Sequence, residues 1–330
     1  MSVKNTFKLF LSISIAIAFV LLIFNKINFD EVIEASAKLK WLWIFSSLFM
    51  FGLGYSFRIQ RWRIMLQVDN PGVKWINCAG PFVASFAINN LLPFRLGDLA
   101  RSFAFNKKLG VNSGGVLATL LVERLFDLLM VLLFLLGSLY LFSINTQYVF
   151  GVGIIALASL VILILFILNF PNLFFPICNY CCKLISIPFP RIGGILMRFV
   201  SNIFKVLDRL SKGRMMIILT FWSLVIWTAE GCVFWFVAMG LPSISKSTAA
   251  WMALPVGTLA TLIPSTPGYL GTFDYFVIQT MQSLGNDIAS SAAFTFIVHA
   301  LLWLPTTIIG GLYIAVNTIS LKDLKAAKNE

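Results

Sequence analysis

The chain alternates long apolar runs with short polar stretches. Several runs reach the roughly 20 residues with which an α-helix crosses the hydrocarbon core of a bilayer. The pattern predicts an all-α, polytopic helical membrane protein. The apolar segments lie at 7–24, 41–57, 75–92, 113–142, 147–170, 215–239, 249–263, 275–284 and 288–316.

Basic residues in the polar stretches indicate which side of the membrane each stretch faces. Residues 58–74, 171–214 and the tail 317–330 carry an excess of lysine and arginine, which is typical of cytoplasmic segments. The turns 143–146 and 240–248 carry only one lysine between them. We therefore place the two turns outside the cell and both termini in the cytoplasm. The expected location of the protein is the plasma membrane. We interpret the first apolar run as an uncleaved helix, not a signal peptide.

The apolar runs do not fit this sidedness as a simple series of crossings. Residues 58–74 and 143–146 lie on opposite sides, yet two apolar runs separate them. The conflict disappears if residues 75–110 enter from the cytoplasm and return as a re-entrant hairpin. The same count of membrane crossings, applied after the outer turn 240–248, makes residues 249–284 a hairpin that enters from outside.

Two hairpins give the chain an internal symmetry. Residues 1–142 and 147–316 then form two repeats of inverted topology with about six crossings in all, followed by a cytoplasmic tail at 317–330. Inverted repeats with broken helices are typical of secondary transporters, whose sites lie near the repeat interface. The alternative is eight ordinary crossings with kinked helices, which would place Lys107 and Lys108 outside.

Composition removes several classes of function. Only 12% of the residues are charged, against roughly a quarter in soluble domains. The net charge of +12 comes from dispersed residues, with no basic patch that would indicate nucleic-acid binding. One histidine and a cluster of Cys178, Cys181 and Cys182, whose role stays open, do not make a zinc site. We predict no metal and no cofactor.

Ionisable residues inside the apolar zone are the candidates for function, because each costs about 2.5–3.5 kcal/mol to insert. Acids and arginines near the first break could simply neutralise one another. However, an arginine beside a Pro/Gly break, at the start of a half-helix, is suited to bind a phosphate. The predicted binding residues are Asn90, Arg95, Asp98, Arg101, Glu123, Arg124, Asp127, Glu230 and Asp274, with backbone breaks at Pro93, Gly97, Pro267, Gly268 and Gly271.

Most of these residues fall into three ordered motifs. The first is a run of Asn and Pro followed by Arg-x-Gly-acid-x-x-Arg, the second is Glu-Arg-x-x-Asp, and the third is a Pro-Gly stretch that ends in an acid. They comprise Asn90, Pro93, Arg95, Gly97, Asp98 and Arg101; Glu123, Arg124 and Asp127; and Pro267, Gly268, Gly271 and Asp274.

The motifs resemble those of the flippase-like transmembrane family that includes the membrane half of lysylphosphatidylglycerol synthases. Two positions depart from that family's pattern: Tyr269 stands at its second glycine, and Asp274 replaces a glutamate. The tyrosine narrows the room for backbone flexibility or ligand approach, and the aspartate keeps the charge with a shorter reach. The chain also ends soon after its last apolar run, so we expect it to lack the soluble aminoacyl-transferase domain of the two-part enzymes.

The resemblance implies a flippase that moves an anionic or zwitterionic amphiphile, either a membrane lipid or a lipid-linked saccharide, between leaflets. No phosphate-binding loop of the ATPase type is present, so we expect transport without ATP hydrolysis and no enzyme activity. Lipid-modifying enzymes or glycosyltransferases are the expected partners. The alternatives are an intramembrane lipid-phosphate transferase or hydrolase, with Asp98, Glu123 or Asp127 as base, and a non-catalytic member of an envelope-biosynthesis complex.

Overall fold

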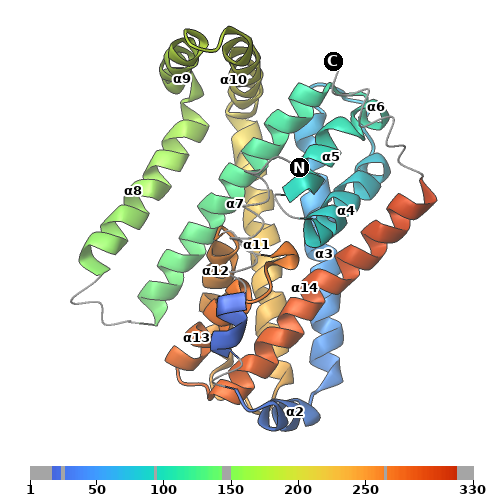
Figure 1. The fold of residues 1–330 in the computed structure, drawn as a ribbon, viewed down its shortest axis with the longest axis vertical. Helices are drawn as coiled ribbons and strands as arrows, with labels where there is room; N and C mark the ends of the chain where they lie inside the picture. Colours follow the sequence, from blue (N-terminus) through green and yellow to red (C-terminus); the bar gives the residue numbers. More distant parts are fainter. Residues whose placement is uncertain (1–16, 24–26, 93–94, 143–149, 264–265, 318–330) are drawn as a thin grey trace.

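The computed structural model describes residues 17–23, 27–92, 95–142, 150–263 and 266–317, and these are helices joined by short connections (Figure 1). The elements after residues 17–23 are α2 (Phe29–Ala37), α3 (Trp41–Leu66), α4 (Trp75–Leu91), α5 (Leu96–Phe103), α6 (Asn106–Leu109), α7 (Ser113–Leu141), α8 (Phe150–Asn169), α9 (Pro171–Ser186), α10 (Pro190–Leu210), α11 (Arg214–Gly240), η2 (Ser247–Ala249), α12 (Ala250–Ala260), η3 (Pro267–Tyr269), α13 (Thr272–Ser283) and α14 (Ile288–Val316).

Three of the described helices, α3, α11 and α14, are long and apolar enough to cross a membrane. The pair α8 and α9 passes the same test but bends by 94° at its break, so the number rises to four if that pair is one span. Helix α7, with 29 residues, also runs through the bundle (Figure 1). These findings confirm a polytopic helical membrane protein. The expected crossing within 7–24 lies largely outside the described residues, and the count of six stays a prediction.

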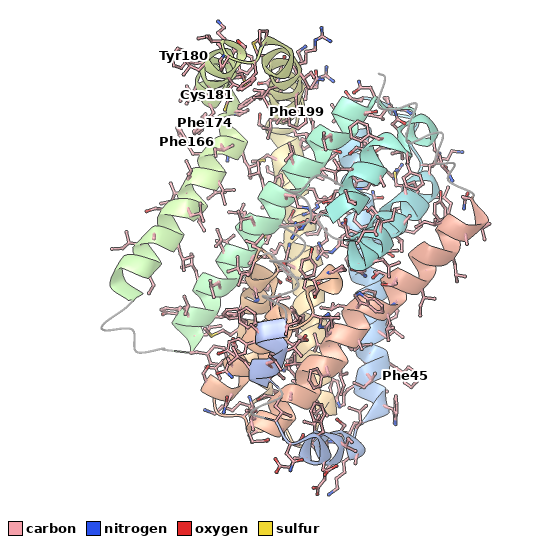
Figure 2. The ribbon with its side chains drawn as sticks, viewed as in Figure 1. Phe45, Phe166, Phe174, Tyr180, Cys181 and Phe199 are labelled. Carbon is pink, nitrogen blue, oxygen red and sulfur yellow. The ribbon has the colours of Figure 1, made fainter. Side chains whose placement is uncertain are left out.

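Apolar side chains cover the outside of the bundle as well as its interior. Phe45 and Phe166 project outward (Figure 2), with 64% and 43% of their surface exposed. In contrast, Trp62 and Phe82 are fully buried. Apolar residues on the outer surface are expected where the surrounding solvent is lipid.

Helices α4 and α5 form the first hairpin. Helix α4 ends at Leu91, and α5 returns along it, so that the Gly97 amide donates to Asn89 Oδ1 at 2.7 Å. A Cβ on Gly97 would lie 1.8 Å from the Ser85 carbonyl oxygen. Gly97 therefore permits close packing of the two helices. Pro93, the other expected break here, lies outside the described residues.

Helices α12 and α13 form the second hairpin, and α13 packs beside α12 after the short turn η3. Pro267 begins η3, while Gly268 and Gly271 have φ angles of 73° and 86°. Left-handed backbone of this kind favours glycine, so both glycines make the reversal possible.

The two hairpins occupy opposite halves of the bundle. Helices α4 to α6 lie on the side of α9 and α10, whereas α12 and α13 lie on the side of α2 (Figure 1). Their tips meet, because η3 contacts α4. This chain path agrees with hairpins that enter from opposite sides, while the division into two inverted repeats stays a prediction.

The boundary of the first polar segment was predicted wrongly. We expected residues 58–74 to form a cytoplasmic stretch, but α3 continues to Leu66, and Arg58 and Arg61 are 8% and 1% exposed within it. Carboxylates on neighbouring helices compensate both arginines, and this permits the charges to be buried.

Candidate functional site

A cavity of about 370 Å³ lies between the two hairpin tips and helices α3, α7, α11 and α14. Its wall is mainly apolar and includes Phe86, Trp227 and Trp303. A mainly apolar wall with a few convergent polar groups is typical of ligand pockets. The predicted site residues that line it are Asn90, Arg95, Arg124, Asp127, Glu230 and Gly268.

Asp127 on α7 is the centre of an ion-pair network. Its Oδ1 accepts from Arg61 Nη2 at 2.8 Å and from the Trp227 indole N–H at 3.2 Å, and Arg58 Nη1 lies 3.8 Å away. Arg124 Nη1 approaches its Oδ2 at 3.6 Å. The network fixes the carboxylate between α3, α7 and α11.

Glu230 on α11, whose role the sequence left open, pairs with Arg58. Arg58 Nη2 donates to Glu230 Oε2 at 2.7 Å, and the guanidinium carbon lies 5.3 Å from the centroid of the Trp227 ring. A cation over an indole face gains further electrostatic stabilisation. Arg58 and Glu230 therefore join α3 to α11 and also face the cavity.

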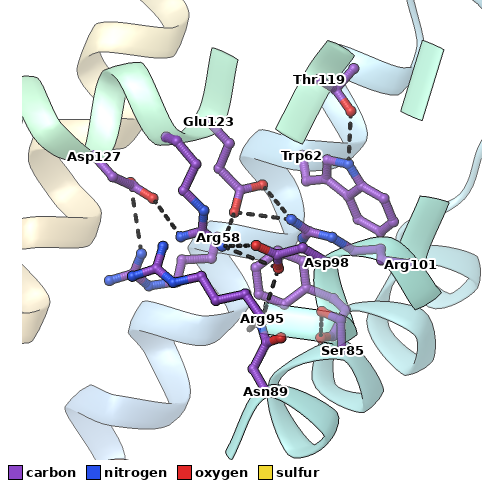
Figure 3. Close-up of polar contacts among 12 residues, drawn as sticks. Arg58, Trp62, Ser85, Asn89, Arg95, Asp98, Arg101, Thr119, Glu123 and Asp127 are labelled. Carbon is purple, nitrogen blue, oxygen red and sulfur yellow. Dashed lines mark hydrogen bonds and ion pairs between the residues drawn. The ribbon is translucent and has the colours of Figure 1, made fainter. Parts of the chain in front are cut away.

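Arg101 and Glu123 lie behind the cavity and not on its wall. Arg101 is fully buried, its Nη2 lies 3.3 Å from both Glu123 oxygens, and its guanidinium carbon is 4.7 Å from the centroids of the Trp62 and Phe82 rings (Figure 3). Glu123 is only 2% exposed. The structure therefore corrects the expectation that these two residues contact substrate: they form an internal pair between α5 and α7.

Asp98 is likewise an internal partner. It accepts from Asn89 Nδ2 at 3.1 Å (Figure 3) and pairs with Arg124 at 3.3 Å. Arg124 thus bridges Asp98 and Asp127 while it faces the cavity. Arg124 therefore connects the first hairpin to the network on α7.

Arg95 is the exception in this network. It immediately precedes α5 with a φ of 51°, and its Nε donates to Tyr269 Oη at 3.2 Å. Among the described residues, no carboxylate forms an ion pair with it. The network contains five arginines and four carboxylates: Arg58, Arg61, Arg95, Arg101 and Arg124 against Asp98, Glu123, Asp127 and Glu230.

Asp274 finds its partner on α14. Its Oδ2 accepts from the Gly271 amide at 2.9 Å, at the start of α13, and His299 Nδ1 lies 2.6 Å from its Oδ1. His299 Nε2 lies 2.9 Å from the Gly268 carbonyl oxygen. A carboxylate and a carbonyl both accept, so the geometry suits an imidazolium that donates from both nitrogens. Asp274 lies behind the wall, and His299 forms part of it.

Asn90 joins the first hairpin to α14. Its Nδ2 lies 2.9 Å from Thr307 Oγ1 and 3.1 Å from Thr306 Oγ1.

Among the described residues, no three His, Cys, Asp or Glu side chains gather as a metal site would require.

Sequence reasoning missed Arg58, Arg61 and His299. The first two carried a detectable signal, because Glu230 had no assigned partner and the arginines stand three residues apart on a helix face. His299 was considered only as a metal ligand, and its contact with Asp274 depends on the packing of α13 against α14.

The chain matches a known protein family along most of its length. A family model described as the lysylphosphatidylglycerol synthase TM region matches residues 9–310. The chain belongs to that family. This result confirms the resemblance drawn from the motifs. A UPF0104 membrane protein of Methanocaldococcus jannaschii is 26% identical to this member of the lysylphosphatidylglycerol synthase TM-region family over 245 residues, which are 74% of this chain and 98% of the relative. No solved structure matches the chain.

Proposed function

We propose that the protein moves an anionic or zwitterionic amphiphile, a membrane lipid or lipid-linked saccharide, between leaflets without ATP hydrolysis. The observation that carries this proposal is Arg95, a guanidinium without a carboxylate partner among the described residues, on the wall of a largely apolar cavity. An intramembrane charge of this kind is costly unless a partner compensates it. The phosphate of an amphiphile would provide that partner, and its acyl chains would contact the apolar wall.

The position of the cavity supports movement between leaflets. It lies where the tips of two hairpins from opposite halves of the bundle meet. Sites of secondary transporters also lie at broken helices. We further propose that the hairpins open in turn to the two leaflets, that both termini are cytoplasmic, and that the protein acts in the plasma membrane beside lipid-modifying or glycosyltransferase enzymes.

The intramembrane transferase or hydrolase has less support. Its proposed bases were Asp98, Glu123 and Asp127, and each of them is engaged by an arginine. Only Asp127 lines the cavity. A general base needs reach to the proton that it removes, so Asp98 and Glu123 are poorly placed for this role.

The test is translocation of a fluorescent phosphatidylglycerol in proteoliposomes, followed by dithionite quenching of the outer leaflet. We expect Arg95→Gln to reduce the rate at least tenfold. Arg198→Gln, on the exposed face of α10, is the matched control and retains the rate. Equal translocation by wild type and Arg95→Gln would refute the assignment of Arg95, and protein-free background rates with every lipid tested would refute transport.

A further inference from the structure

Two residues at the hairpin tips share an unusual backbone conformation. Among the described residues other than glycine, only Arg95 and Tyr269 have positive φ angles, of 51° and 61°. Such angles are uncommon for residues with a Cβ, and where they persist the surrounding structure determines them. Arg95 lies at the tip of the first hairpin and Tyr269 at the tip of the second.

These two residues contact each other across the junction. Arg95 Nε donates to Tyr269 Oη at 3.2 Å, and the guanidinium carbon lies 6.0 Å from the centroid of the tyrosine ring. Both side chains line the cavity. The unusual backbone at each tip therefore brings the one unpaired arginine of the network to a phenol on the opposite hairpin.

The contact leaves hydrogen-bond donors free for a ligand. A guanidinium has five N–H groups, and Nε accounts for the one that Arg95 uses among the described residues. The Tyr269 oxygen accepts that bond, so its own O–H remains able to donate. Two Nη groups and one phenol O–H can then converge on one acceptor group. Phosphate matches them, because it offers several oxygens and pairs bidentately with guanidinium.

We infer that Arg95 and Tyr269 together form a phosphate site, with the phenol as a donor to a phosphate oxygen. The inference rests on the proposed function and identifies its ligand chemistry as the phosphate of an amphiphile. It also gives a role to Tyr269, whose phenol faces the cavity beside Arg95. Because the donors come from both hairpins, a bound phosphate holds the two tips together.

The experiment measures binding to the purified full chain in detergent micelles. The probes are fluorescent phosphatidylglycerol, the matching diacylglycerol without phosphate, and inorganic phosphate as competitor. We expect Tyr269→Phe to weaken phosphatidylglycerol binding about tenfold, the equivalent of one hydrogen bond to a charged group, with no change for diacylglycerol. Arg95→Gln weakens it further, and the double variant adds little to Arg95→Gln because both donors serve one phosphate.

A second tyrosine provides the control. Tyr313 Oη accepts from Lys108 Nζ at 2.8 Å and does not line the cavity. Tyr313→Phe therefore removes a comparable phenol–cation contact and leaves the phosphatidylglycerol affinity unchanged. If Tyr269→Phe fails to fold, Tyr269→Gly, which suits the left-handed backbone, gives the same selective loss.

The outcomes separate the phosphate site from transport. Unchanged phosphatidylglycerol affinity in Tyr269→Phe, or an equal loss with diacylglycerol, would overturn the site. A selective loss in a protein that translocates nothing would support the site and reject the proposed function. Binding of inorganic phosphate that depends on Tyr269, without binding of the lipid, would support the anion site but assign it to free phosphate.

Discussion

Replacement of Arg101 with methionine tests whether the pair behind the cavity is structural. The change removes a fully buried guanidinium and takes away the closer ion-pair partner of Glu123, at 3.3 Å, so that this carboxylate, 2% exposed, keeps only Arg124 at 4.0 Å. Breaking a buried pair by removing one partner costs about 3–5 kcal/mol, since the remaining charge stays desolvated. We therefore expect Arg101→Met to lower stability by at least 3 kcal/mol.

The expected shift is large enough to measure. The entropy of unfolding is about 2.1 cal/mol/K per residue, so in a chain of 330 residues a loss of 3 kcal/mol lowers Tm by about 4 °C. Thermal unfolding in detergent, followed by tryptophan fluorescence, gives Tm for wild type and variants. Arg209→Met serves as control, because it breaks an Asp69 pair of 2.7 Å with Arg209 52% exposed, and such pairs contribute only about 0–1 kcal/mol.

A double variant distinguishes the effect of an unpaired buried charge from a general disruption of packing at this position. Arg101→Met with Glu123→Leu removes both charges, and replacement of a whole buried pair by apolar residues is often neutral. We expect the double variant to be more stable than Arg101→Met alone. If Arg101→Met retains the wild-type Tm but loses phosphatidylglycerol binding, Arg101 belongs to the substrate site and our assignment is wrong.

Three other experiments test the packing of the first hairpin, the ion-pair network and the sidedness of the two hairpins. Gly97→Ala should prevent the close approach of α5 to α4, because the new Cβ would lie 1.8 Å from a backbone carbonyl oxygen of α4; a Tm lowered by less than 2 °C would contradict this packing. Glu230→Gln should lower Tm, since it removes the charge 2.7 Å from Arg58, and Arg58→Met in the same chain should recover part of the loss. With native cysteines replaced by serine, Lys108→Cys should react with a membrane-impermeant maleimide only from the cytoplasm, and Ser283→Cys only from outside; labelling of position 108 from outside would refute the first hairpin.

The helices were predictable because their apolar runs follow from the cost of burying polar backbone in lipid. The two breaks were predictable as well, since Gly97 and Gly268 stand where apolar runs are interrupted. The end of α3 was not. Arg58 and Arg61 look like the start of a cytoplasmic stretch in the sequence, and only their long-range pairing with Asp127 and Glu230 shows that they are internal.

The division of the candidate site into wall and support was equally invisible in the sequence. Arg95 and Arg101 belong to the same motif, six residues apart, with Arg95 immediately before α5 and Arg101 within it. Arg101 pairs with Glu123 between two aromatic rings, whereas Arg95, among the described residues, has a phenol and no carboxylate as its partner at the cavity. Both residues are arginines of one motif, so their charge does not distinguish their roles. The difference comes from α7, α3 and η3, which are distant in the sequence.

The distribution of charge around the cavity is unequal in a way that suits an amphiphile. Arg58, Arg95, Arg124, Asp127 and Glu230, on the cavity wall, come from α3, α7, α11 and the first hairpin. The second hairpin adds no charged side chain to the described wall: it contributes the Tyr269 phenol, threonines and apolar side chains. A headgroup can therefore bind on one side of the cavity while the chain next to it contacts apolar groups. Since the arginines of this network exceed its carboxylates by one, the negative charge of one headgroup phosphate would complete the network, and a headgroup without an anionic group would leave Arg95 uncompensated.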